Sequence, residues 1–214
     1  MKGIMLKDLY DNFCIPKNAA SFVFAALIIL PAGLLFRSAE YYTLFIGVIT
    51  PLLGACAVES STEQDEAANF NKLMITFPVT KAEIVLSKYL LGLIFILASN
   101  LIALICTMVQ VYIHHTVRLA EAARMWGIGL SVSLLCLSVI YIGYFLLGKR
   151  WGTIFFIVIV SMIGALFGAL RSLYGIEIFL NCSPLLVFGL LAAGAVTVAL
   201  SCLASIGIYK KKYS

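Results

Sequence analysis

The sequence predicts an all-α integral membrane protein with six transmembrane helices in one domain, residues 1–214. Six stretches of 17 to 24 residues contain no Asp, Glu, Lys, Arg or His, and together they cover 124 of the 214 residues. They are 19–36, 42–58, 89–112, 125–147, 153–170 and 185–208. A helix needs about 20 apolar residues to cross a bilayer core of about 30 Å. The composition agrees, with 63% hydrophobic and only 12% charged residues, about half the charged share of a soluble domain.

The distribution of basic residues predicts the orientation. If the N-terminus is cytoplasmic, 11 of the 15 Lys and Arg residues fall on the inner side, including every lysine. The outer side then holds four arginines, Arg37, Arg118, Arg124 and Arg171. Basic residues concentrate on cytoplasmic loops, so both termini are expected inside the cell. This bias also accounts for the net charge of +5, so the positive charge does not indicate a nucleic-acid partner.

The first expected element is an interfacial helix over residues 2–14, within an N-terminal segment of residues 1–18. One helical face carries Met5, Leu6, Leu9, Tyr10 and Phe13, and the other mainly Lys2, Lys7, Asp8, Asp11 and Asn12. This spacing is typical of a helix lying in the membrane surface, and Pro16 is expected to end it. The alternative is a charged flank that only anchors the first span. The segment lacks the apolar centre of a signal peptide and is expected to stay on the mature protein.

The long connection at residues 59–88, after the second span, is expected to be a cytoplasmic coupling segment. Ser60, Ser61 or Thr62 is a candidate N-cap for a short helix over 62–74, and acidic residues at 63, 65 and 66 suit its first turns. Phe77 and Pro78 are expected to stop that helix. The run Thr80-Lys81-Ala82-Glu83 reads as a capping box that starts a helix continuing into the third span. The alternative is a loosely ordered linker.

The remaining connections carry no metal-ligand or catalytic pattern. Residues 148–152 form a tight basic turn whose Lys149, Arg150 and Trp151 are a second candidate contact for a cytoplasmic partner, or else a membrane anchor. Gly143–Arg150 has the G-x-x-x-x-G-K spacing of a phosphate loop. However, Arg150 replaces the Ser or Thr that holds magnesium, and the motif ends a span. We therefore expect no catalytic residues, no metal site and no nucleotide site on this chain.

The spans lack charged groups for coupling to protons. Their only amides, Asn100 and Gln110, lie ten residues apart on the third span and face different directions. They are expected to bond to neighbouring helices, with a role in lining a pathway as the alternative. The six scattered cysteines are expected to be packing residues. Any uphill transport therefore needs energy from a soluble partner, for which residues 59–88 are the natural docking segment.

Three segments resemble a known family. MKGIMLKDLY at the start, DEAANFNK at 65–72 and FPVTKAEIVLSKYL at 77–90 are similar to type-2 ABC-transporter permeases. More narrowly, they resemble the small six-span permeases related to exporters of phenol-soluble modulins, which are amphipathic peptides. One departure is Phe70, where family members often carry Trp near the acidic pair.

The resemblance implies a permease subunit of an ATP-driven exporter in the bacterial cell membrane. It implies a second permease subunit, identical or homologous, and a separate ABC ATP-binding subunit that supplies ATP and Mg. The ATPase contacts would come from the N-terminal helix and the connection after the second span, at Lys7, Asp8, Glu63, Asp65, Glu66, Phe70, Lys72, Phe77, Pro78 and Lys81. An amphipathic or antimicrobial-type peptide is the implied substrate. Two alternatives stay open, a six-span substrate-binding subunit for uptake and a peptide-binding immunity or scaffold protein.

Overall fold

The computed structural model describes residues 2–56, 59, 61–62, 64–65 and 80–212. In this part of the chain every regular element is helical. They are α1 (Lys2–Phe13), α2 (Pro16–Leu35), α3 (Ala39–Leu44), η1 (Phe45–Ile49), α4 (Thr50–Ala55), α7 (Lys81–Tyr112), α8 (Leu119–Tyr174), α9 (Glu177–Leu180) and α10 (Pro184–Lys212). The prediction of an all-helical fold is confirmed for these residues.

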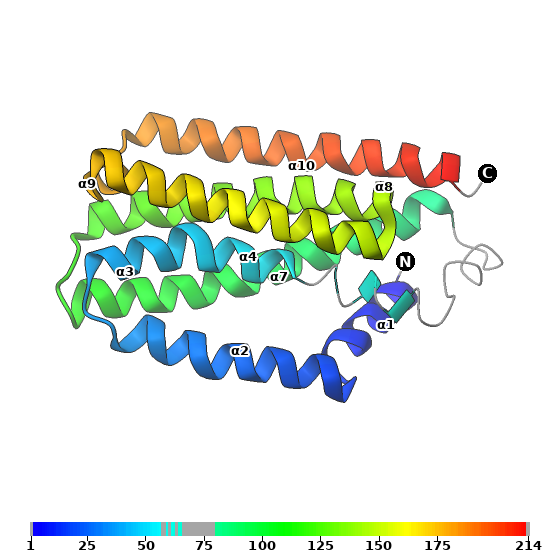
Figure 1. Ribbon diagram of the computed structural model, residues 1–214, viewed down its shortest axis with the longest axis horizontal. Helices are drawn as coiled ribbons and strands as arrows, with labels where there is room; N and C mark the ends of the chain where they lie inside the picture. The colour runs from blue at the N-terminus through cyan, green and yellow to red at the C-terminus, as the bar shows by residue number, and fades with distance from the viewer. Residues whose placement is uncertain (1, 57–58, 60, 63, 66–79, 213–214) are drawn as a thin grey trace.

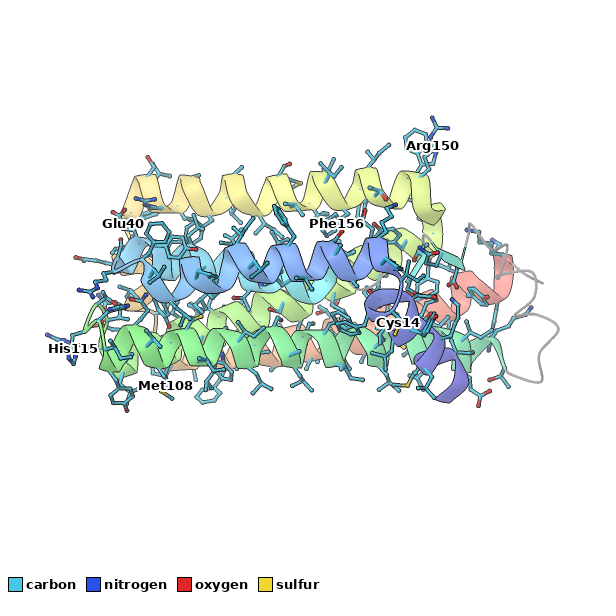
Figure 2. The ribbon with its side chains drawn as sticks, turned by 90° about the horizontal axis from the view of Figure 1, so that it is seen from below. Cys14, Glu40, Met108, His115, Arg150 and Phe156 are labelled. Carbon is cyan, nitrogen blue, oxygen red and sulfur yellow. The ribbon has the colours of Figure 1, made fainter. Side chains whose placement is uncertain are left out.

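The long helices lie side by side in an elongated bundle (Figure 1). The short helix α1 and the end of α10 lie at one end, which we call the α1 end. The short helix α9 lies at the opposite end, which we call the α9 end. Arg150 and Cys14 are at the α1 end, whereas Glu40 and His115 are at the α9 end (Figure 2).

Four helical segments of the described residues are long and apolar enough to cross a membrane, namely Lys81–Tyr112, Leu119–Gly148, Arg150–Tyr174 and Pro184–Lys212. α3, η1 and α4 follow one another without a break and form a shorter apolar rod over Ala39–Ala55. α2 is 20 residues long. The helices therefore coincide with the six apolar stretches of the sequence, while the exact number of spans stays a prediction.

The break between the fourth and fifth stretches occurs at Gly148. α8 runs from Leu119 to Tyr174, but Gly148 has φ 76° and ψ −174° inside it. A side chain disfavours such a positive φ, and glycine tolerates it. The chain reverses direction there, and the two halves of α8 lie antiparallel (Figure 1). This is the tight turn that the sequence predicts at residues 148–152.

The rod of α3, η1 and α4 packs closely against α8. Pro51 lies in the first turn of α4 and has no N–H to donate. The preceding residues form the π-helix η1, and the Thr50 hydroxyl donates to the Phe45 carbonyl at 3.0 Å, which satisfies a backbone group in the irregular stretch. Gly129 of α8 lies directly against this rod, where a Cβ atom would come within 2.6 Å of the Ile46 carbonyl oxygen.

α1 is a separate short helix that ends at Phe13, and Pro16 begins α2, as expected. Its apolar side chains Leu6, Tyr10 and Phe13 are exposed, which suits a helix in contact with the membrane surface. Leu9 packs on Leu91 and Phe95 of α7. The opposite, polar face of α1 turns inward, and that inward face forms the site described next.

Candidate functional site

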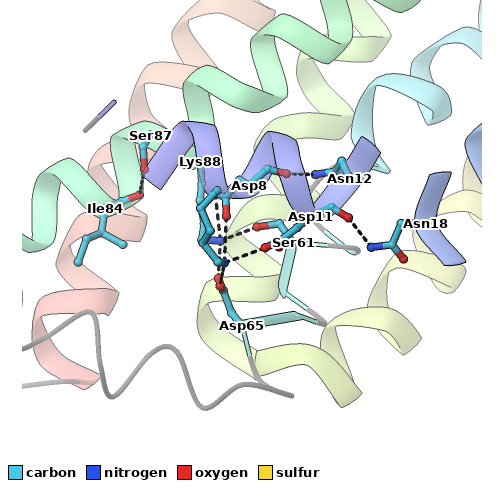
Figure 3. A network of polar contacts seen from close by, with 10 residues as sticks. Asp8, Asp11, Asn12, Asn18, Ser61, Asp65, Ile84, Ser87 and Lys88 are labelled. Carbon is cyan, nitrogen blue, oxygen red and sulfur yellow. Dashed lines mark hydrogen bonds and ion pairs between the residues drawn. The ribbon is translucent and has the colours of Figure 1, made fainter. Parts of the chain in front are cut away.

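Three segments that are distant in sequence bring charged side chains together at the α1 end. They are α1, the described residues 59, 61–62 and 64–65 beyond α4, and the first turns of α7. The group, which we call the charged junction, consists of Lys7, Asp8, Asp11, Ser61, Asp65 and Lys88 (Figure 3).

Lys88 is the centre of the charged junction. Its ammonium group donates to Asp65 Oδ2 at 2.6 Å and to Ser61 Oγ at 2.7 Å. It also lies 3.5 Å from Asp8 Oδ2, an ion pair across to α1. Lys88 is only 7% exposed, Asp65 2% and Asp8 0%. One buried cation of α7 therefore holds carboxylates from two other segments.

Lys7 supplies the second cation, from α1 itself. It pairs with Asp11 Oδ2 at 2.9 Å, one helical turn away, and with Asp8 Oδ1 at 3.3 Å. It also bonds to Asp65 Oδ1. Asp65 thus accepts from a lysine on each side, which ties residues 61–65 to both α1 and α7.

Two amides fix the backbone on which these carboxylates lie. Asn12 donates to the Asp8 carbonyl oxygen at 2.7 Å, and Asn18 donates to the Asp11 carbonyl oxygen at 2.7 Å. Both amide side chains are buried. Because Asn18 belongs to α2, its bond fixes the turn between α1 and α2 and orients the polar face of α1 toward the junction.

Two groups of the junction, Asp65 and Lys7, are held in their ionised forms by their neighbours. Burial acts to raise the pKa of Asp65, but the ammonium groups of Lys88 and Lys7 outweigh it, so the pKa lies below its ordinary 3.8. Burial acts to lower the pKa of Lys7, and the Asp65 charge and hydrogen bond outweigh that effect and raise it above 10.5. Asp65 and Lys7 therefore carry full charges near neutral pH.

The chemistry of this arrangement is that of an ion-pair connector. The carboxylates of Asp8, Asp11 and Asp65 offer oxygens within 4.8 Å of one another, a spacing that can hold a cation. Here the ammonium groups of Lys7 and Lys88 already lie among these oxygens. A buried charge left without its partner is strongly destabilising, so the three segments are held together as one unit.

The structure brings together three of the residues singled out from sequence, namely Lys7, Asp8 and Asp65. Asp8 and Asp65 face inward rather than outward, so in this conformation they bind other parts of the chain. Glu63, Glu66, Phe70, Lys72, Phe77 and Pro78 lie outside the described residues. The contact of these residues with a partner protein stays a prediction.

The other expected positions are found where the sequence places them. Thr80 and Glu83 form the predicted capping box at the start of α7, with Lys81 in its first turn. Arg150 and Trp151 are exposed at the turn after Gly148, and of Lys149 only the backbone is described. Of the three N-cap candidates, Ser60 lies outside the described residues, whereas Ser61 and Thr62 have helical geometry. The Ser61 hydroxyl accepts a hydrogen bond from Lys88.

The two amides in the third span have separate structural roles. Gln110 donates to the Phe36 carbonyl oxygen at 2.7 Å and accepts from the Thr116 hydroxyl at 2.7 Å, which joins two connections at the α9 end. Asn100 donates to the Ile96 carbonyl oxygen of its own helix at 2.9 Å. Both side chains are buried. Gln110 thus bonds to connections rather than to a neighbouring helix and Asn100 to its own helix, and a role of either amide in lining a pathway stays a prediction.

Sequence reasoning missed the burial of Lys88, which it counted as a cytoplasmic surface charge. A signal was present, because Ile84, Lys88, Leu91 and Phe95 follow helical spacing and therefore share a face. It also missed an interhelical hydroxyl cluster in which Tyr89 bonds to Ser201 Oγ at 2.5 Å and to Ser205 Oγ at 2.9 Å. Isolated serines in apolar stretches carry no pattern that predicts such pairing.

Comparison with known proteins identifies a family for nearly the whole chain. The family described as "ABC-2 family transporter protein" matches residues 3–210. No curated protein and no solved structure matches the chain.

Proposed function

Because the chain belongs to the ABC-2 family of transporter proteins, we propose that it is the membrane-spanning permease subunit of an ATP-driven exporter. Membership implies a membrane transport component that works with an ABC ATPase subunit. The proposal goes further in three respects, which are the topology, the route by which the ATPase acts, and the cargo. The observation that carries it is the charged junction.

The proposed topology has six spans with both termini in the cytoplasm of a bacterial cell. The spans are α2, the rod of α3 to α4, α7, the two halves of α8, and α10. In support, the lysines of α1, the start of α7 and the end of α10 all fall at the α1 end. Basic residues favour the cytoplasmic side, so the α1 end would face the cytoplasm.

The charged junction suits the transfer of force from a cytoplasmic partner. It binds α1, residues 61–65 and α7 to one another through buried ion pairs. Residues 66–79, which lie outside the described part of the chain, directly follow Asp65 and carry half of the predicted ATPase contacts. A push on that segment reaches α7 through Asp65 and Lys88, and reaches α1 through Asp65 and Lys7.

A second permease subunit is the proposed partner within the membrane. The second half of α8 is a candidate interface, since its Ser161, Gly164, Ala165, Gly168 and Ser172 are exposed small residues. No atom lies within 4 Å of a Cβ placed at Gly164 or Gly168. Small residues at this spacing allow close approach of a second helix. The surface at Gly164 and Gly168 is therefore free of contacts with the described part of this chain and could accept a helix of a second subunit.

The proposed cargo is an amphipathic peptide, and this part rests on the sequence resemblance. The experiment is transport by sealed vesicles that contain the chain and the ATPase subunit with which it co-purifies. A fluorescent synthetic amphipathic helix serves as cargo, and vesicles without ATP are the control. We expect ATP-dependent movement of peptide toward the side opposite the ATPase.

Other results of that experiment would replace the proposal. Movement toward the ATPase side would indicate an uptake system, and binding without movement would indicate a scaffold or immunity protein. Accumulation of peptide by the chain alone, without ATPase, would contradict the proposed source of energy.

A further inference from the structure

A cavity of about 530 Å³ lies between the two antiparallel halves of α8, in a region away from the charged junction. Its volume falls within the range of small-molecule and cofactor sites, about 300 to 1,000 Å³. The wall is built from both halves of α8 together with Gly47 of η1, Phe179 of α9 and Leu190 of α10. Its side chains are hydrocarbon or sulfur-containing throughout.

The cavity opens sideways, toward the surroundings of the bundle. Val139 and Leu166, one from each half of α8, are 42% and 62% exposed while they also line the cavity. Both lie on helix segments that are long and apolar enough to cross a membrane. The opening therefore faces the hydrocarbon of the bilayer rather than water.

The closed side of the cavity is formed by close packing. At Gly47, in the middle of the π-helix η1, a Cβ atom would come within 2.9 Å of the Met125 methyl carbon and 3.3 Å of the Phe167 ring. π-helical turns inside α-helices occur frequently at functional sites. Phe167 stacks on Phe179 with ring centroids 4.8 Å apart, and both rings belong to the wall of the cavity.

We propose that the cavity holds one acyl chain of a bilayer lipid, which enters between the two halves of α8. Among the described residues that line it, the wall offers no side chain suited to recognise peptide groups or a polar ligand. An apolar cavity excludes water, and leaving it empty forfeits packing contacts on every side. A lipid chain is the hydrocarbon that the bilayer presents at the opening. Met125 is an adaptable side chain at the floor, suited to a flexible chain.

The charge at the α9 end fits the headgroup of the same lipid. Leu170 lines the cavity, and Arg171 follows it in the sequence. The Arg171 guanidinium is partly exposed, with its Nη2 atom 2.5 Å from Glu40 Oε2. Arginine presents donors that match phosphate geometry. A lipid phosphate at this end would have to share the guanidinium with Glu40, which already pairs with it.

The test uses the full chain in vesicles of phosphatidylethanolamine and phosphatidylglycerol, without any ATPase, so its result is independent of the proposed transport function. A phospholipid with a photoreactive group in the middle of its acyl chain is activated by light, and the labelled residues are mapped by mass spectrometry. We expect labelling concentrated on cavity residues such as Val132, Ile163 and Leu166. Labelling spread evenly over the exposed face of α10 and the second half of α8 would overturn the proposal.

A matched pair of variants tests the same site by occupancy. Ile163→Trp fills the cavity, whereas Met162→Trp adds the same ring at a neighbouring position that is 62% exposed and lies outside the lining. We expect Ile163→Trp to lose most of the cavity labelling and Met162→Trp to retain it. Unchanged labelling in Ile163→Trp would contradict the site. If an unlabelled amphipathic peptide displaces the label where a tenfold excess of lipid does not, the occupant is a peptide and the lipid assignment is wrong.

Discussion

Lys88 donates to Asp65 through a 2.6 Å contact between Nζ and Oδ2, and both side chains are almost fully buried. This pair joins the third apolar helix to the segment that follows the second one. Asp65 also binds Lys7 of α1, so this carboxylate connects the N-terminal helix to the transmembrane bundle in addition to the ion pair between Asp8 and Lys88.

Replacing Lys88 by Met should destabilise the protein, because Asp8 and Asp65 lose a buried cation. Removing one partner of a buried ion pair costs about 3–5 kcal/mol. Thermal unfolding in detergent measures the loss. Lys211→Met removes an exposed lysine of α10 and should change stability by less than about 0.5 kcal/mol.

The pairing itself is tested by adding Asp65→Asn to Lys88→Met. The loss of unfolding free energy in the double variant should be smaller than the sum of the losses in the two single variants. In the double variant, replacing one residue no longer leaves the charge of its partner unpaired. Strict additivity would show that the two residues act separately.

The charged junction should be insensitive to pH over a wide range. The pKa of Asp65 is lowered below 3.8, so its contribution to stability is present above that pH and is lost as the pH falls through the folded-state value. The pKa of Lys7 is raised above 10.5, so its contribution is present below that pH and is lost on further increase. The difference in melting temperature between wild type and Asp65→Asn should stay constant from pH 5 to 9. It should shrink only below pH 3.8, and a midpoint near neutral pH would contradict this assignment.

Two native cysteines test the proposed orientation. Cys14 is exposed near the α1 end, and Cys182 lies between α9 and α10 at the α9 end. A membrane-impermeant maleimide applied to intact cells should label a variant that keeps only Cys182. A variant that keeps only Cys14 should react after the cells are opened. The reverse result would place both termini outside the cell.

Bulky residues on the exposed small-residue face of α8 should weaken association between permease subunits. Gly168→Leu places a large side chain on that face, where the wild-type surface is open. Gly189→Leu is the control, because Gly189 of α10 has equally open surroundings. Crosslinking in membranes should show fewer dimers for Gly168→Leu alone. Equal dimer yields in both variants would exclude this face as the interface.

Much of the fold follows from one physical requirement, which is that apolar segments of spanning length form helices in a bilayer. The apolar stretches, the capping box at Thr80 and Glu83, the proline at the start of α2 and the turn at Gly148 all carry local signals. The π-helix at Phe45–Ile49 could not be anticipated in the same way. Pro51 follows it in the first turn of α4 and Gly129 of α8 packs against it, and the second of these contacts is tertiary and carries no local signal.

Only some of the residues of the charged junction could be predicted from the sequence, and their mutual contacts could not. The family resemblance implies Lys7, Asp8 and Asp65 as candidate contacts for the ATPase. It does not reveal that they bind one another, since pairing Asp65 with Lys7 requires contact between residues 58 positions apart. Lys88 looked like one more basic residue on the cytoplasmic side. Only the folded arrangement shows that it lies inside the protein.

The most direct test of the account is the amount of peptide moved per ATP hydrolysed by vesicles that contain the permease and its ATPase subunit. Wild type and the Lys211→Met control should give the same ratio. Lys88→Met complexes that remain assembled should still hydrolyse ATP but give a ratio near zero, because the force from the ATPase no longer reaches α7. An unchanged ratio in assembled Lys88→Met complexes would contradict the claim that the charged junction couples the ATPase to the membrane helices.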